Sequence, residues 1–257
     1  MENRTVLLTG HVMQTTKICV ALFSIFLILP NDLNADSVVL DASLDNTIYE
    51  DNTSNSNGAG DFIFAGQNGD GSPRRALLSF DFSSIPSNAI IESVTLNLTA
   101  SQVGSDVATD VSLHRVTSDW GESTSDATGG EGGGTAAAID DATWDFSFFD
   151  NQNWNTPGGD FITGPSATTV VGVTGDYSWT GPGLVGDVQG WLDGTNSNFG
   201  WILIGDETAI QTSKRFNSRT NGANNPSLSV QFSVVPEPTS ACILIAGLAG
   251  LVARRRR

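Results

Sequence analysis

Apolar and polar residues alternate with a period of two along the middle of the chain, which is typical of strands that bury one face. In one such stretch, Leu78, Phe80 and Phe82 share a face, and in another Phe62 and Phe64 do so. The alternation predicts strands at 61–65, 76–82, 94–100 and 227–232. Apolar runs bounded by turn residues predict four more, at 37–41, 111–116, 168–173 and 200–204.

One segment has helical spacing instead. Leu184, Val188 and Trp191 recur at intervals of three and four residues and predict a helix of about two turns. Many short strands, joined by turns rich in Gly, Asn, Asp and Ser, surround this single helix. The pattern predicts an all-β domain at 36–234, folded as a jelly-roll-like β-sandwich with one short helix.

The alternation breaks between residues 121 and 165. This stretch is rich in glycine and acidic residues, with a Gly-rich run at 129–134, and aromatic residues follow closely. A long loop inside a compact domain is usually functional or disordered, and the aromatic density argues against disorder. We therefore predict a Gly-rich loop insert with aromatic anchors.

The N-terminal residues carry an export pattern. Lys17 precedes an apolar stretch at 18–29, Pro30 ends it, and Ala35 places a small residue at the position that a signal peptidase reads. We predict a signal peptide at 1–35, cleaved after Ala35. Met13 is an alternative start, because residues 1–12 add nothing that a signal peptide needs.

The C-terminal residues 235–257 form a second targeting pattern. Pro236, Glu237 and Pro238 precede an apolar run that ends in four arginines. The run is shorter than the roughly 20 residues of a full membrane span, and arginines are costly to move across a bilayer. The pattern predicts a short apolar helix that anchors the exported chain temporarily. We expect the protein to contact the membrane through this helix alone.

This tail resembles the PEP-CTERM sorting signals that exosortases process in Gram-negative bacteria. The resemblance implies export, transient anchoring in the inner membrane, and delivery to the cell surface or extracellular matrix. Signal peptidase and an exosortase are the processing partners that it implies.

Composition excludes several kinds of chemistry for the domain. Both cysteines, Cys19 and Cys242, lie in the targeting segments, and His114 is the single histidine between residues 36 and 234. Zinc, haem and iron–sulfur sites need clusters of Cys or His. The formal net charge of −16 opposes binding to nucleic acid or anionic membranes, whereas an uncharged glycan is an acceptable partner.

Catalytic patterns are missing as well. Acidic residues are abundant, but no spacing singles out the carboxylate pair of a glycosidase. His114 lies in the middle of a predicted strand without a nucleophile motif, so we expect a structural role for it. The sequence predicts a protein that is not an enzyme.

Motifs along most of the domain resemble the DNRLRE-type secreted domains. They are DNTIY at 45–49, RALLSFDF at 75–82, IESVTLNL at 91–98, VTSDW at 116–120, DVQGW at 187–191 and FNSR at 216–219. The resemblance implies a β-sandwich related to carbohydrate-binding modules, with calcium in the fold and acidic polysaccharide bound by some members. The long insert after Trp120 departs from the family, and the negative charge makes an anionic glycan a poor candidate.

Aromatic residues are the candidate glycan-binding groups. Trp144, Trp154 and Trp179 are flanked by Gly, Asp and Asn, and with Tyr177 they are expected to stack on sugar rings. Trp191 and Trp201 lie on apolar faces and are expected in the core.

Charged clusters supply the other candidate sites. Calcium requires six to eight oxygen ligands, and the carboxylates available for it are Asp45, Glu50, Asp51, Asp140 and Asp141. The alternative is a solvated acidic surface. Five basic residues cluster at 74–75 and 214–219, where pairing with carboxylates is favoured over an anion-binding site.

These observations predict a secreted, exosortase-sorted protein of the cell surface or exopolysaccharide matrix that binds polysaccharide without catalysis. The alternatives are a purely structural matrix protein without a ligand and a carbohydrate-active enzyme. Neither the sugar nor the oligomeric state follows from the sequence.

Overall fold

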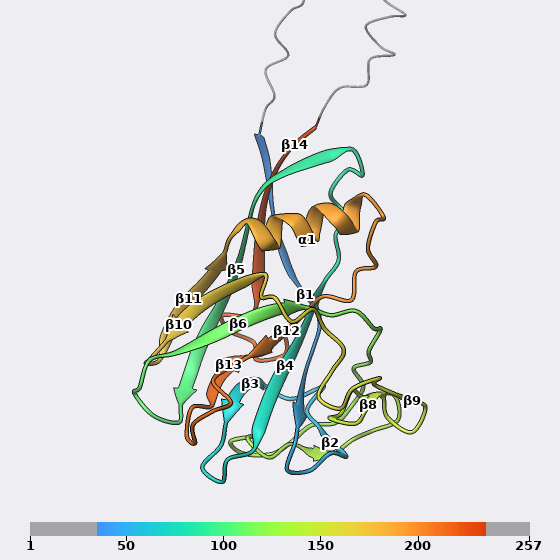
Figure 1. Ribbon diagram of the computed structural model, residues 1–257. Coiled ribbons are helices and arrows are strands. Elements are labelled where there is room, and N and C mark those ends of the chain that lie inside the picture. Colours follow the sequence, from blue (N-terminus) through green and yellow to red (C-terminus); the bar gives the residue numbers. More distant parts are fainter. Residues whose placement is uncertain (1–34, 235–257) are drawn as a thin grey trace, which may run out of the picture. The chain divides into compact units, whose positions relative to one another are not determined.

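Two antiparallel sheets face each other in the computed structural model, which describes residues 35–234 (Figure 1). The elements are β1 (Ala35–Tyr49), β2 (Asn55–Ser56), β3 (Phe62–Gln67), β4 (Pro73–Phe80), β5 (Ala89–Val103), β6 (Thr109–Arg115), β7 (Thr135–Ala136), β8 (Phe146–Phe148), β9 (Gln152–Asn153), β10 (Ala167–Val171), β11 (Gly175–Thr180), α1 (Pro182–Leu192), β12 (Trp201–Ile204), β13 (Lys214–Asn217) and β14 (Ser227–Val234). All eight predicted strands and the helix are present, which confirms the predicted β-sandwich.

Two strands pass from one sheet to the other. The first sheet contains the start of β1, then β14, β5, β11, β13 and the start of β3. The second contains the ends of β1 and β3, which both pair with β4, and then β12, β6 and β10. The register of β1 shifts between Ala42 and Leu44, where the strand leaves β14 and joins β4. Such an irregularity bends a strand and lets it form a corner between sheets.

The main core fills the space between the two sheets. Leu96 and Leu98 of β5 face Leu78 and Trp201 of the second sheet, all at most 2% exposed. The helix α1 adds Trp191, whose ring centroid lies 4.6 Å from that of Trp201. The core positions expected for these two tryptophans are therefore confirmed.

The insert covers part of the outer face of the second sheet, over β4 and β12, as a third layer. Leu77 of β4 and Ile202 of β12 point away from the main core and are fully buried. Trp120, Trp144 and Trp154 pack on them in a second hydrophobic cluster. Two short strand pairs, β2 with β7 and β8 with β9, order this layer. The predicted loop insert is thus a packed element with its own core.

The described chain begins and ends in neighbouring strands, because Ala35 of β1 lies opposite Ser233 of β14. The signal peptide expected at 1–35 lies outside the described residues except for Ala35. The sorting motif Pro236, Glu237 and Pro238 and the apolar helix after it also lie outside them. Between residues 35 and 234, no helix has the length and hydrophobicity needed to cross a bilayer.

The third layer generates a stability prediction. Trp154→Ala should lower the free energy of unfolding by about 3–5 kcal/mol, because it leaves a cavity in the second cluster and removes the hydrogen bond from Trp154 Nε1 to the Thr143 carbonyl. Trp154→Phe, the matched control, keeps most of the ring volume and should cost less. Thermal and urea unfolding measure both values. An alanine variant as stable as the wild type would show that the insert does not support the fold.

Candidate functional site

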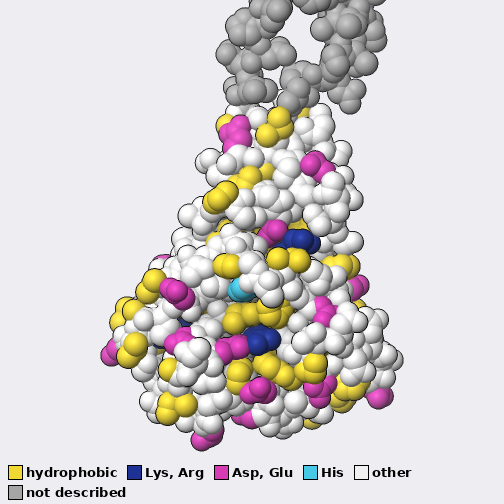
Figure 2. All heavy atoms as spheres, viewed as in Figure 1, with side chains coloured by type: hydrophobic (Ala, Val, Ile, Leu, Met, Phe, Trp, Pro, Cys, Tyr) yellow, Lys and Arg dark blue, Asp and Glu magenta, His cyan; other side chains and the backbone are white. Residues whose placement is uncertain are grey.

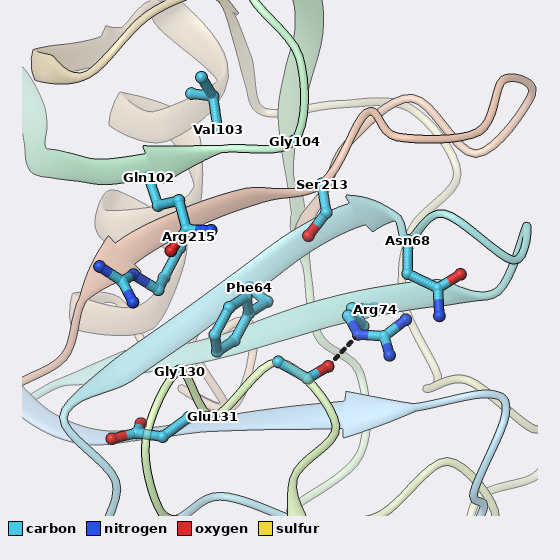
Figure 3. Close-up of a pocket in the computed structure, with 11 residues that line it drawn as sticks. Phe64, Asn68, Arg74, Gln102, Val103, Gly104, Gly130, Glu131, Ser213 and Arg215 are labelled. Carbon is cyan, nitrogen blue, oxygen red and sulfur yellow. Dashed lines mark hydrogen bonds between the residues drawn. The ribbon is translucent and has the colours of Figure 1, made fainter.

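A groove of about 390 Å³ lies on the outer face of the first sheet (Figure 3). Arg215 of β13 lies at one end of it, with Phe64 of β3 opposite it on one side and Gln102 of β5 on the other. We call this feature the Arg215 groove. It is lined mainly by Phe64, Arg74, Gln102, Glu131, Ser213 and Arg215. Its volume lies within the range of small-molecule sites.

Arg215 is held in place without a counter-ion. Its guanidinium carbon lies 3.8 Å from the centroid of the Phe62 ring, and its Nε donates to Ser101 Oγ at 3.1 Å. No ion pair of Arg215 occurs within residues 35–234. Burial lowers the pKa of the guanidinium, and the nearby Glu131 carboxylate opposes that shift. The group remains charged, and its two Nη atoms have no hydrogen-bond partner within residues 35–234.

The Gly-rich run of the insert forms the opposite wall. Arg74 Nε donates to the Gly132 carbonyl, and Arg74 Nη2 pairs with Asp51 at 3.0 Å (Figure 3). The Glu131 carboxylate accepts the backbone N–H of Phe62 at 2.9 Å and an amide N–H of Asn57 at 2.8 Å. These contacts fix residues 130–132 above Phe64.

The other basic side chains between residues 35 and 234 have carboxylate or carbonyl partners within the fold. Arg75 pairs with Glu207 at 2.7 Å, Arg115 with Asp187 at 3.2 Å, and Arg219 with Glu122. Lys214 is fully buried, and its Nζ donates to two backbone carbonyls. The pairing with carboxylates predicted for the basic cluster is confirmed for Arg74, Arg75 and Arg219, whereas Lys214 and Arg215 make no ion pair within residues 35–234. Acidic side chains are spread over the surface in Figure 2, while Lys and Arg appear at few places.

The expectation that three tryptophans offer exposed stacking faces is wrong. Trp144 is 7% exposed, Trp154 is 5% and Trp179 is 0%. Trp144 and Trp154 cover the apolar second sheet, and the Trp179 indole enters the main core, where its N–H donates to the Val111 carbonyl at 2.7 Å. The prediction was based on the polar residues that flank these tryptophans in sequence. The tryptophan rings point inward although their sequence neighbours are polar.

Tyr177 does not offer a free hydroxyl either. Its ring is half-buried, and its hydroxyl donates to the Val173 carbonyl at 2.9 Å within its own hairpin. The same oxygen accepts the N–H of Val173 at 3.2 Å. This tyrosine closes the turn between β10 and β11.

Residues of the Arg215 groove were not predicted as a site. Phe62 and Phe64 were expected on the core face of their strand, but Ile63 and Ala65 take that face. Both faces of this strand are apolar, so its alternation did not identify the inner one. Arg215 was recognised only as part of a basic cluster.

The five expected calcium ligands do not converge. Asp51 pairs with Arg74, Asp140 accepts a hydrogen bond from Asn151, and Glu50 is exposed. Within residues 35–234, no three His, Cys, Asp or Glu side chains are arranged to hold a metal ion. Calcium binding stays a prediction of the family resemblance.

The remaining two, Asp45 and Asp141, are buried where the insert joins the sandwich. Asp141 accepts the N–H groups of Ser123 and Ala138 at 2.6 and 2.9 Å. Asp45 Oδ2 accepts the N–H of Arg219 at 2.6 Å, while its Oδ1 is buried without a hydrogen-bond partner in the described chain. Burial raises the pKa of Asp45 to about 7.

Residues 36–128 match the family model of carbohydrate-binding module family 96. The matched stretch spans β1 to β6 and the beginning of the insert, and it includes Phe64, Arg74 and Gln102 of the groove. No curated protein matches the chain. The family match supports a carbohydrate-binding β-domain.

Asp45 generates a prediction about pH. An aspartate in water has a pKa of 3.8, whereas that of Asp45 is about 7 in the fold, so the folded state binds the extra proton between these values. Stability in metal-free buffer should therefore fall as the pH rises from 4 to 8, by up to about 4 kcal/mol. Burial also raises the pKa of Glu122, which acts in the same direction.

Asp45→Asn mimics the protonated form and should be more stable than the wild type at pH 8. Its stability should also depend less on pH. Asp41→Asn changes an exposed acid of the same strand and should behave like the wild type. Urea unfolding at several pH values measures these differences. A wild-type stability that rises with pH over this range would contradict the assignment.

Proposed function

We propose that the protein is an exported, non-catalytic glycan-binding module that holds its ligand in the Arg215 groove. The observation that carries the proposal is the Arg215 guanidinium, which has no ion pair within residues 35–234, beside the Gln102 side chain in the Arg215 groove. The match to a carbohydrate-binding module family supports the same assignment.

The groove has the groups that a sugar requires. The Arg215 guanidinium and the Gln102 amide supply donors and an acceptor for neighbouring hydroxyl groups, and Ser213 adds a hydroxyl. Phe64 is only 5% exposed, so it supports the floor of the groove from below, and the polar side chains supply the contacts with the ligand. Sites of this kind combine an apolar lining with a few polar groups that orient the ligand.

The same groove argues for binding without catalysis. Glycoside hydrolysis uses two carboxyl groups on either side of the scissile bond. The Glu131 carboxylate is the one carboxylate among the described residues that line the groove. Its oxygens already accept hydrogen bonds from the Asn57 side chain and from the backbone N–H groups of Asp61 and Phe62. Glu131 is therefore a structural residue that fixes the Gly-rich wall.

Removing groove donors should weaken binding to polysaccharide. Arg215→Ala and Gln102→Ala should each reduce the affinity for a binding polysaccharide by about tenfold, the value of a hydrogen bond to a charged or well-placed group. Affinity electrophoresis in gels that contain soluble β-glucan, mannan, xylan or alginate identifies the ligand and measures the loss.

Gln231→Ala is the matched control, because this exposed glutamine lies on β14 of the same sheet, outside the groove. It should bind like the wild type. Equal binding by all three variants would exclude the Arg215 groove as the site. Failure of the wild type to bind any polysaccharide would favour the purely structural matrix protein.

We further propose that signal peptidase and an exosortase process the chain and release it to the cell surface or the extracellular matrix. The Pro236, Glu237 and Pro238 motif with its apolar run and arginines supports this proposal. Intact-mass spectrometry of the protein secreted by its native host should find a C-terminus near Val235. An extracellular form that retains Arg254 to Arg257 would contradict sorting by cleavage.

A further inference from the structure

A second groove, of about 530 Å³, lies on the outer face of the second sheet, beside the insert. Val111 and Leu113 of β6 point into the main core, so Asp110, Ser112 and His114 face outward. Val170 of β10 lies opposite Asp110, and Ile204 of β12 lies opposite Ser112. We call this feature the acidic groove. Its principal residues are Asp110, Ser112, His114, Val170, Ile204 and Asp206.

Two carboxylates of the acidic groove have no cationic partner. The Asp110 carboxylate makes neither a hydrogen bond nor an ion pair within the described part of the chain, although its backbone belongs to the ladder between β6 and β10. Asp206 accepts the N–H and hydroxyl groups of Thr208 at 2.8 and 2.6 Å, and these bonds lower its pKa and hold it ionised. The third acid, Glu207, is neutralised by Arg75, whose Nε and Nη2 both lie 2.7 Å from its oxygens.

No other group of the groove supplies positive charge. His114 packs edge-on against Phe161 with ring centroids 5.4 Å apart, and one ring nitrogen lies 3.0 Å from the Ile162 carbonyl. Burial lowers the pKa of this histidine, so it is neutral at pH 7. Figure 2 shows it in cyan beside apolar side chains, with a basic side chain and acidic side chains a little further away. The groove therefore attracts a cation and repels an anion.

The floor also offers contacts that suit a sugar ring. Ser112 Oγ and Thr168 Oγ1 lie 2.9 Å apart and together can bond to a ligand hydroxyl. Val170 is 57% exposed and presents an apolar surface beside Asp110. A metal ion makes no use of the apolar groups, whereas a glycan uses both the apolar and the hydroxyl groups.

We propose that the acidic groove binds glycans that contain hexosamine units with free amino groups. The ammonium group donates to Asp110 and Asp206, the ring packs on Val170 and Ile204, and hydroxyl groups bond to Ser112 and Thr168. Charge-assisted hydrogen bonds of this kind are stronger than those between neutral groups. The inference is independent of the Arg215 groove, which lies on the other sheet and has the opposite charge.

Isothermal titration calorimetry tests the proposal by measuring the affinity of the purified protein for two ligands, glucosamine hexasaccharide and N-acetylglucosamine hexasaccharide. Acetylation removes the positive charge and keeps the sugar backbone. The free amine form should bind at least about tenfold more tightly, since each hydrogen bond to a charged group contributes about that factor. Asp110→Asn and Asp206→Asn should each weaken its binding at least about fivefold.

Two control variants distinguish binding in the acidic groove from binding elsewhere on the protein. Asp176→Asn removes an exposed acid on β11 of the first sheet and should leave binding unchanged. Gln231→Ala, which lies outside both grooves, should also leave it unchanged. The Arg215 groove is tested with its own variants and polysaccharides, so failure of the Arg215 groove and failure of this proposal are distinguishable. Melting temperatures verify that each variant is folded. The change Asp110→Asn keeps the size of the side chain, and the Asp110 carboxylate has no partner within residues 35–234 whose loss could disturb the fold.

Several results would overturn the proposal. These are equal affinity for the two hexasaccharides, no binding of the free amine form, and a loss in Asp176→Asn as large as in Asp110→Asn. The last result would show general attraction of a cation to an acidic protein. Binding of hexalysine with the same dependence on Asp110 would replace the sugar by a basic peptide.

Discussion

The burial of the middle of β4 and β12 on both faces is the constraint on which the rest of the structure depends. Leu77 and Ile202 point away from the main core, yet both are fully buried under the insert. Burying one such side chain contributes about 1.5–3 kcal/mol, so a bare outer face would be strongly unfavourable. The tryptophans of the insert serve this need first, and for that reason they are not available as a sugar platform.

The covering layer also shapes the binding surfaces. Once Trp144 and Trp154 fix the insert on the second sheet, its Gly-rich run reaches the edge of the first sheet and forms a wall of the Arg215 groove. At its other end, Phe161 packs on His114 beside the acidic groove. The segment predicted as a functional loop therefore acts through its backbone and its packing, and the ligand groups come from the strands.

The sequence predicted the strands well because the period-two alternation of apolar and polar residues reflects which side chains of one strand are buried. That information is contained in residues that are neighbours in sequence. It also contained the signal for the third layer. Residues 76–78 and 201–203 are each three consecutive apolar residues, the pattern of strands buried on both faces. The Arg215 groove gave no such signal. Phe64, Gln102 and Arg215 become neighbours only through the register of three strands that are distant in sequence.

Net charge is a poor guide to the ligand of such a domain. Charges on the surface are screened over about 8 Å at physiological ionic strength, so a bound sugar responds to the groups that line its groove. The two grooves differ sharply in this respect, since Arg215 is unpaired in one and Asp110 and Asp206 are unpaired in the other. The overall charge of −16 weakens the long-range attraction of anions. Arg74, Arg75, Arg115 and Arg219 form ion pairs within the fold. These ion pairs therefore determine which basic side chain is left to contact a ligand.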